Sequence, residues 1–176
     1  MNTANPSQNS GMGGKIELSN SKGVSVYGNL TSTGRYGLEG EITIRTENTV
    51  ITSNNGVNDG IRSVISGRKF NKMGYGTLLL GGVSQVYSAY LNAGLLQLGV
   101  ANALPSYCTL ELLGGNLHDG GITSTINAIN MDKNTKIILG DTEHSLTLSS
   151  IGRLASDAFL TFNVSDGIVA EAALTT

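Results

Sequence analysis

The stretch Gly76-Thr-Leu-Leu-Leu-Gly-Gly82 decides the fold, because it is a short leucine-rich run that ends in glycine. Similar runs follow at Gly94-Leu-Leu-Gln-Leu-Gly99 and at Thr109-Leu-Glu-Leu-Leu-Gly-Gly115. Short strands that are bounded by glycine and recur at nearly even spacing are typical of stacked β-coils rather than of a mixed globular domain.

The spacing of the repeats supports this interpretation. Leu78 and Leu96 lie 18 positions apart, and Leu96 and Leu112 lie 16 apart. Elsewhere apolar residues two positions apart, or β-branched residues, indicate strands with one buried face. Such strands are predicted at residues 15–19, 23–27, 41–45, 49–52, 63–66, 85–87, 122–126, 136–139, 145–148 and 158–164. Residues 168–174 fit a short helix and a last strand equally well.

Two all-β architectures accommodate strands of this length. A β-solenoid gives every strand a neighbour above and below, which short strands need for stability. An antiparallel β-sandwich or jelly roll fits the strand lengths as well. The repetition of whole segments, rather than of alternation alone, favours the solenoid. We expect a flexible N-terminal lead at residues 1–14, a single β-solenoid domain at residues 15–176, and repeat-like character in residues 64–121.

Composition narrows the possible functions. The 176 residues include 24 glycines, only 14% charged residues and a net charge of −2. The sequence has no basic stripe for binding nucleic acid. Arg68, Lys69 and Lys72 are predicted to lie in a solvated turn. No signal peptide is visible, and no apolar run is long enough for a membrane-spanning helix. Cys108 is predicted to be a small buried hydrophobic residue.

No group of residues forms a convincing catalytic, cofactor or metal site. His118 and Asp119 are adjacent in a glycine turn, where neighbouring side chains point apart, so a catalytic dyad is disfavoured. The loop Asp141-Thr-Glu-His144 offers two carboxylates and an imidazole, and we interpret it as a solvated turn. Asp132, Asp141 and Glu143 are candidates for a polysaccharide-cleaving enzyme, but they do not recur at a coil spacing.

The tyrosines are the best candidates for contact with a ligand or partner. Aromatic side chains on a neutral, hydroxyl-rich surface can stack on sugar rings or anchor a protein. We expect this role for Tyr27, Tyr36, Tyr75 and Tyr90. Tyr87 is instead expected to lie in the core or to cover a corner.

An ordered set of motifs resembles the autotransporter-associated β-strand repeat. The set is Lys72-Met-Gly-Tyr-Gly-Thr-Leu-Leu-Leu-Gly-Gly82, preceded by Val64-Ile-Ser-Gly67 and followed by Val86-Tyr87, residues 91–99, residues 102–106 and residues 110–117. It covers about a third of the chain. The chain departs from the family pattern between Gly82 and Gly94, where the central Gly-Thr pair is missing. There is also no C-terminal region of the amphipathic strands that form a membrane barrel.

The resemblance implies a right-handed parallel β-helix that is exposed on a bacterial surface or secreted. From it we expect a non-enzymatic structural or adhesive passenger segment, without cofactors, whose partners are glycans or proteins of a host or neighbouring cell. The alternative is a self-assembling protein of an extracellular filament or phage fibre, in which an unblocked end strand recruits another copy.

Overall fold

The structure is a computed structural model that describes residues 14–20, 24–25, 30–32, 40–46, 50–52 and 65–164. Within these residues every regular element is a β-strand, and the paired strands run parallel in a β-solenoid of about five turns. The predicted solenoid is therefore confirmed, and the antiparallel sandwich is excluded. Apart from Gly14, the predicted lead lies outside the described residues, as does the segment 168–174.

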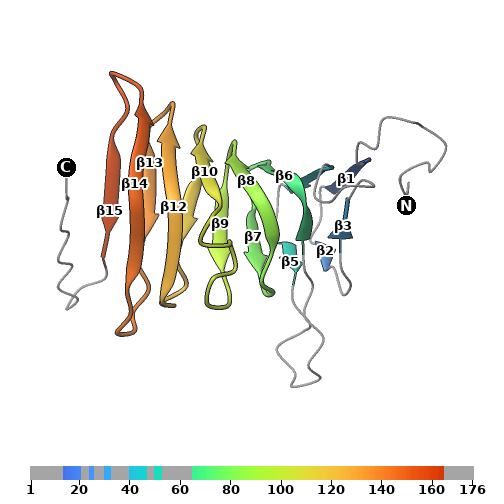
Figure 1. Ribbon diagram of the computed structural model, residues 1–176, viewed down its shortest axis with the longest axis horizontal. Coiled ribbons are helices and arrows are strands. Elements are labelled where there is room, and N and C mark those ends of the chain that lie inside the picture. The colour runs from blue at the N-terminus through green and yellow to red at the C-terminus, as the bar shows by residue number, and fades with distance from the viewer. Residues whose placement is uncertain are drawn as a thin grey trace.

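Two parallel sheets run along the solenoid axis, which lies horizontally in Figure 1. The first sheet contains β1 (Lys15–Asn20), β4 (Glu41–Thr46), β6 (Ile65–Met73), β8 (Gln85–Leu91), β10 (Thr109–Leu112), β12 (Ser124–Met131) and β14 (Leu146–Leu154), in that order, with β3 (Leu30–Thr31) also paired to β6. The second contains β2 (Val24–Ser25), β5 (Val50–Thr52), β7 (Thr77–Leu80), β9 (Leu95–Leu98), β11 (Asn116–His118), β13 (Thr135–Ile138) and β15 (Leu160–Asn163).

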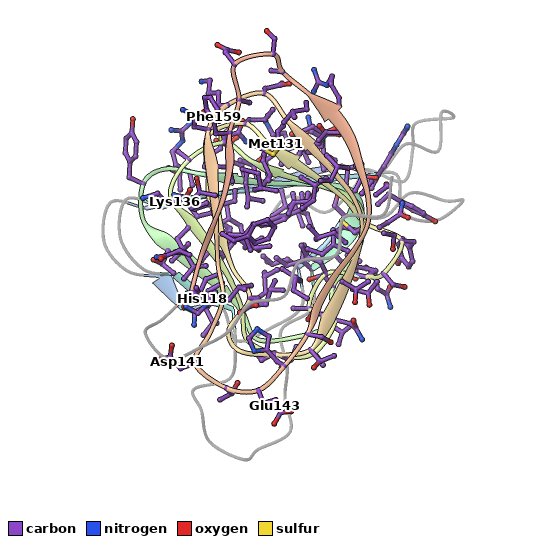
Figure 2. All side chains as sticks on the ribbon, turned by 90° about the vertical axis from the view of Figure 1, so that its left-hand side faces the viewer. His118, Met131, Lys136, Asp141, Glu143 and Phe159 are labelled. Carbon is purple, nitrogen blue, oxygen red and sulfur yellow. The ribbon has the colours of Figure 1, made fainter. Side chains whose placement is uncertain are left out.

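The core consists of columns of apolar side chains between the two sheets (Figure 2). Register pairing aligns one column of the first sheet as Ile16, Ile42, Phe70, Ala89, Leu110, Ile129 and Ile151. In the second sheet the pairing aligns Leu78, Leu96, Leu117, Ile137 and Phe162. Burying one such large apolar side chain is worth about 1.5–3 kcal/mol. Coil-on-coil packing of these columns therefore supplies the main driving force for the fold.

The three leucine-rich runs do not occupy equivalent positions. Leu78 faces Leu96 across β7 and β9, as their spacing predicts. Leu96, however, faces Leu117 in β11, whereas Leu112 lies in the other sheet and faces Leu91. The predicted equivalence of the third run is wrong, because strands of both sheets carry the same pattern of alternating leucines.

The basic residues predicted in a solvated turn lie instead within strand β6. Three of the long strands of the first sheet bend, so that two successive side chains point outward between inward ones: in β8, Tyr87 and Ser88 separate the buried Val86 and Ala89. Arg68 and Lys69 take the equivalent outward positions in β6.

Lys72 points inward and is fully buried, in register with Ile44 and Leu91. Its ammonium donates hydrogen bonds to the carbonyl oxygens of Met73, Gly74 and Ala93, at 2.9, 2.7 and 3.3 Å. The prediction of a solvated position was wrong because backbone acceptors at the corner replace water.

Two corners require glycine. Gly94 has φ of 70°, and an added Cβ there would lie 2.4 Å from the carbonyl oxygen of Gly76. Gly120 has φ of 73°, and its added Cβ would lie 2.0 Å from the carbonyl oxygen of Leu98. Both the left-handed conformation and the close approach of the neighbouring coil exclude a side chain at these positions.

Candidate functional site

A groove of about 330 Å³ crosses the outer face of the first sheet. It is lined by Gly40, Glu41, Arg68, Lys69, Ser88 and Tyr90. Five of these residues lie on three adjacent strands, β4, β6 and β8, and Gly40 directly precedes β4. Parallel stacking therefore gathers on one surface residues that are up to 50 positions apart in the sequence.

Strand register fixes the order of these side chains. Glu41 pairs with Lys69, and Lys69 pairs with Ser88, so the three form one outward row across the coils. Two positions further along the strands, Tyr90 lies beside Asn71 in the next outward row. The groove thus lies between two rows of polar side chains on a rigid sheet, which holds the groups at fixed separations.

The groove combines two cations, one carboxylate and a phenol. The Lys69 Nζ atom lies 4.4 Å from the centroid of the Tyr90 ring, within the range of a cation–π interaction. A Glu41 Oε1 atom accepts a hydrogen bond of 2.6 Å from Asn71 Nδ2, which orients the carboxylate. Arg68 is exposed, whereas Lys69 and Tyr90 are partly buried. The groove can therefore offer both cationic donors and oxygen acceptors to a ligand.

A pair of tyrosines adjoins the groove. The rings of Tyr87 and Tyr107 lie 5.5 Å apart with a tilt of 46°, and their side chains are half-exposed. Tyr87 does not lie in the core, because the bend of β8 turns it outward. Burial, and then the neighbouring Tyr87 and Cys108, raise the pKa of Tyr107, so its hydroxyl stays protonated at neutral pH.

Of the predicted contact residues, Tyr90 is the one that lies in this groove. Tyr75 is 84% exposed at the turn between β6 and β7, away from the rows that form the groove. Tyr27 and Tyr36 lie outside the described residues. Sequence reasoning missed Arg68, Lys69 and Glu41 as members of the site. Glu41 and Lys69 lie 28 positions apart, and Lys69 and Ser88 lie 19 apart, so no constant spacing in the sequence marks these residues as neighbours.

A second polar cluster lies inside a corner of the solenoid. Asp119 is fully buried, directly after β11, and its Oδ1 atom accepts hydrogen bonds from the backbone N–H groups of Gly121 and Gly140, at 2.9 and 2.8 Å. Its Oδ2 atom lies 2.6 Å from Nε2 of His144, whose side chain is only 6% exposed. The pair joins two successive coils.

The protonation state of this pair follows from its partners. The other ring nitrogen of His144, Nδ1, lies 2.5 Å from the carbonyl oxygen of Thr142, so both ring nitrogens face oxygen acceptors. The Thr142 carbonyl is the main cause that raises the pKa of His144, and Asp119 adds to it against the opposing effect of burial. The cluster therefore favours an imidazolium paired with a carboxylate.

The cluster confirms the expectation for His118 and Asp119 and contradicts the one for His144. His118 and Asp119 do point apart, since His118 Nδ1 accepts a hydrogen bond from the backbone N–H of Gly120 at 2.8 Å. His144 was expected in a solvated turn, and that was wrong: the next coil turns it inward onto Asp119. Sequence reasoning missed the Asp119–His144 pair because its members are 25 residues apart.

The three candidate carboxylates do not come together. Asp132 follows β12 and forms an ion pair of 2.9 Å with Arg153. Asp141 and Glu143 follow β13 and are exposed on the rim of one corner, as Figure 2 shows. In the part of the chain that the structure describes, no group of three or more His, Cys, Asp or Glu side chains could hold a metal ion.

Cys108 is buried, as predicted, and burial raises the pKa of its thiol to about 12.

No family model, curated protein or solved structure matches this chain. Among the described residues there is no helix of the length and apolar character that crossing a membrane requires.

Proposed function

We propose that this protein is a non-enzymatic β-solenoid that serves as a structural or adhesive segment on a bacterial surface or after secretion. The observation that carries the proposal is the separation of roles between the two faces of the sheets. The inward columns from Ile42 to Ile129 and from Leu78 to Ile137 are fully buried and hold the coils together. The outward side chains are therefore available to contact glycans or proteins along the length of the rod.

The resemblance to the autotransporter-associated β-strand repeat supports the surface location, because passengers of that family are typically exposed rods. The outward rows support the adhesive role. They carry hydroxyl, amide and aromatic groups, among them Ser88, Tyr90 and Thr109, which suit contacts with glycans or with proteins.

The test is adhesion by the intact chain. Beads coated with the full-length protein are applied to surfaces that carry bacterial or animal cell glycans, and bound beads are counted. The control is Leu96→Asp, which puts an uncompensated charge into a buried column and destroys the solenoid. Retention that depends on the folded chain supports the proposal. Equal retention of both bead types contradicts it.

The second candidate function is self-assembly into a filament or fibre. The end formed by β14 and β15 exposes apolar side chains that continue the inner columns: Ile151, Leu154 and Phe162 are 41–53% exposed. At the other end, Ile16 and Leu18 on β1 continue the same columns of the first sheet. Stacking β1 of one copy on β14 of another would extend the sheet head to tail.

One feature of β14 makes assembly the second candidate rather than the first. The pairing of β12 and β14 shifts register between Ile129 and Met131, so β14 carries a bulge there. A bulge interrupts the regular edge that another strand would need. Light scattering over a concentration series, with negative-stain images, tests assembly. Growth that Leu154→Lys abolishes and Thr147→Lys leaves intact supports it, and a constant monomer mass of 18.3 kDa contradicts it.

A further inference from the structure

We propose that the groove between β4, β6 and β8 binds a carboxylated sugar, a uronic acid unit of an acidic polysaccharide. The inference rests on the adhesive role proposed above and names the ligand class of that role. Four observations on the groove and its surroundings carry it.

The first observation is the pair of adjacent cations. Arg68 and Lys69 both point outward because β6 bends at this pair, which is followed by the inward Phe70. A guanidinium group can bind a carboxylate through two parallel hydrogen bonds, and an ammonium group adds a third donor. Both cations line the same groove, so a single carboxylate bound there can contact both.

The second observation is the presence of oxygen acceptors beside these cations. The Oε1 atom of Glu41 accepts a hydrogen bond of 2.6 Å from Asn71, which holds the carboxylate in place. Ser88 adds a hydroxyl in the same row. These groups suit sugar hydroxyls, which donate hydrogen bonds. The Glu41 charge also opposes a sulfate-rich or phosphate-rich ligand, and so favours one carboxylate per ring.

The third observation is the aromatic surface. Tyr90 lines the groove, and its ring holds the Lys69 ammonium, whose nitrogen lies 4.4 Å from the ring centroid, in place for the carboxylate. Tyr87 and Tyr107 lie at the adjoining bend with half-exposed rings. Tyrosine rings stack on the apolar face of a sugar, and they lose little conformational freedom in doing so.

The fourth observation is the extension of the rows along the axis. Ser88 pairs with Thr109, and Tyr90 pairs with Glu111, so polar side chains continue beyond the groove on β10. A polymer with one anionic ring in the groove can therefore lie across the next coil. This arrangement suits a polysaccharide better than a single small anion.

The experiment is a titration of the full-length chain with oligogalacturonate, followed by NMR shift changes or calorimetry. The comparison probes are neutral oligogalactan, which lacks the carboxylates, poly-L-glutamate, which lacks the rings, and heparin, which carries sulfates. We expect oligogalacturonate to bind at least about tenfold more tightly than each of the three, because the galactan lacks carboxylates, poly-L-glutamate lacks sugar rings, and the sulfates of heparin are repelled by the Glu41 carboxylate.

Variants locate the site. Arg68→Gln and Lys69→Gln are each expected to weaken binding about tenfold, through loss of a charge-assisted hydrogen bond. Tyr90→Ala should weaken it further, because it removes the ring that holds Lys69, and Tyr90→Phe should retain most of the affinity, because it keeps that ring. The matched control is Lys136→Gln, which removes an exposed lysine from the outside of the other sheet (Figure 2) and should leave binding unchanged. Circular dichroism of each variant verifies that the solenoid is intact.

Three results would overturn the inference. They are equal binding of poly-L-glutamate, tighter binding of heparin, or the same loss of affinity with Lys136→Gln as with Lys69→Gln. The two proposals fail separately. Coated beads that adhere without any affinity for oligogalacturonate refute the ligand and leave adhesion standing. Affinity for oligogalacturonate without bead adhesion supports the groove and refutes the adhesive role.

Discussion

Removal of His144 is expected to destabilise the solenoid in a pH-dependent way. The variant His144→Ala deletes the imidazole that lies 2.6 Å from the buried Asp119 carboxylate. Asp119 would keep its two backbone donors, Gly121 and Gly140, but would lose the imidazole as a side-chain donor. A buried hydrogen bond to a charged group contributes about 1.5–3 kcal/mol, so we expect a loss of that size in the free energy of unfolding.

The sign of the pH dependence follows from the direction of the pKa shift. The folded state raises the pKa of His144 above its ordinary value of 6.5, mainly through the Thr142 carbonyl and then through Asp119. A group with a raised folded pKa stabilises the protein fully below its unfolded pKa. That contribution is lost as the pH rises through the folded pKa. The destabilisation caused by His144→Ala should therefore be larger at about pH 5.5 than at about pH 9.

The assay is urea unfolding followed by far-UV circular dichroism, on the wild type and the variant at both pH values. His118→Ala is the matched control, because it removes the other histidine at the same corner and costs a hydrogen bond with the Gly120 N–H. His144→Gln keeps a neutral donor and should recover part of the loss. A difference between wild type and His144→Ala that is constant, or that grows with pH, would refute the assignment of an imidazolium–carboxylate pair.

Three further predictions concern the core. Leu96→Ala should cost about 2–5 kcal/mol in urea unfolding, because it empties a fully buried column position, whereas the outward Gln97→Ala should cost less than about 0.5 kcal/mol. Lys72→Met should cost about 1–3 kcal/mol despite its greater hydrophobicity, since corner carbonyls lose their donor, and a stabilised variant would contradict this account. Cys108 should react with a thiol reagent at least about a hundredfold more slowly in the folded protein than in urea; fast labelling of the folded state would contradict its burial.

The strands were predictable from the sequence, but their assignment to two sheets was not. Alternation of apolar and polar residues marks a strand with one buried face, and this identifies Leu78 and Leu96 correctly. The alternation is the same whichever sheet the strand joins. Leu112 therefore resembles Leu96 in the sequence and yet faces Leu91 in the other sheet.

The candidate groove was predictable only in part. Tyr90 was predicted as a contact residue because it is an aromatic residue in a polar run. The basic pair Arg68 and Lys69 was misassigned because basic residues near glycine are typical of turns, whereas here they occupy the bend of a long strand. Glu41 joins them through register pairing, which depends on the length of each coil, and that length varies along this chain.

Lys72 and Asp119, which are buried charged residues of the described chain, share a physical explanation that the sequence alone did not reveal. Lys72 occupies the last inward position of β6, and Asp119 follows directly after β11, so each lies where a strand gives way to a corner. Backbone groups at a corner leave the sheet and lose their ladder partners, and burial without a partner costs free energy. Lys72 donates to three such carbonyl oxygens, and Asp119 accepts from two such N–H groups. Several hydrogen bonds to one charge offset its desolvation, which an isolated buried charge would not achieve. In this solenoid a buried charged residue therefore indicates a corner, and the sign of the charge indicates whether carbonyl or N–H groups converge there.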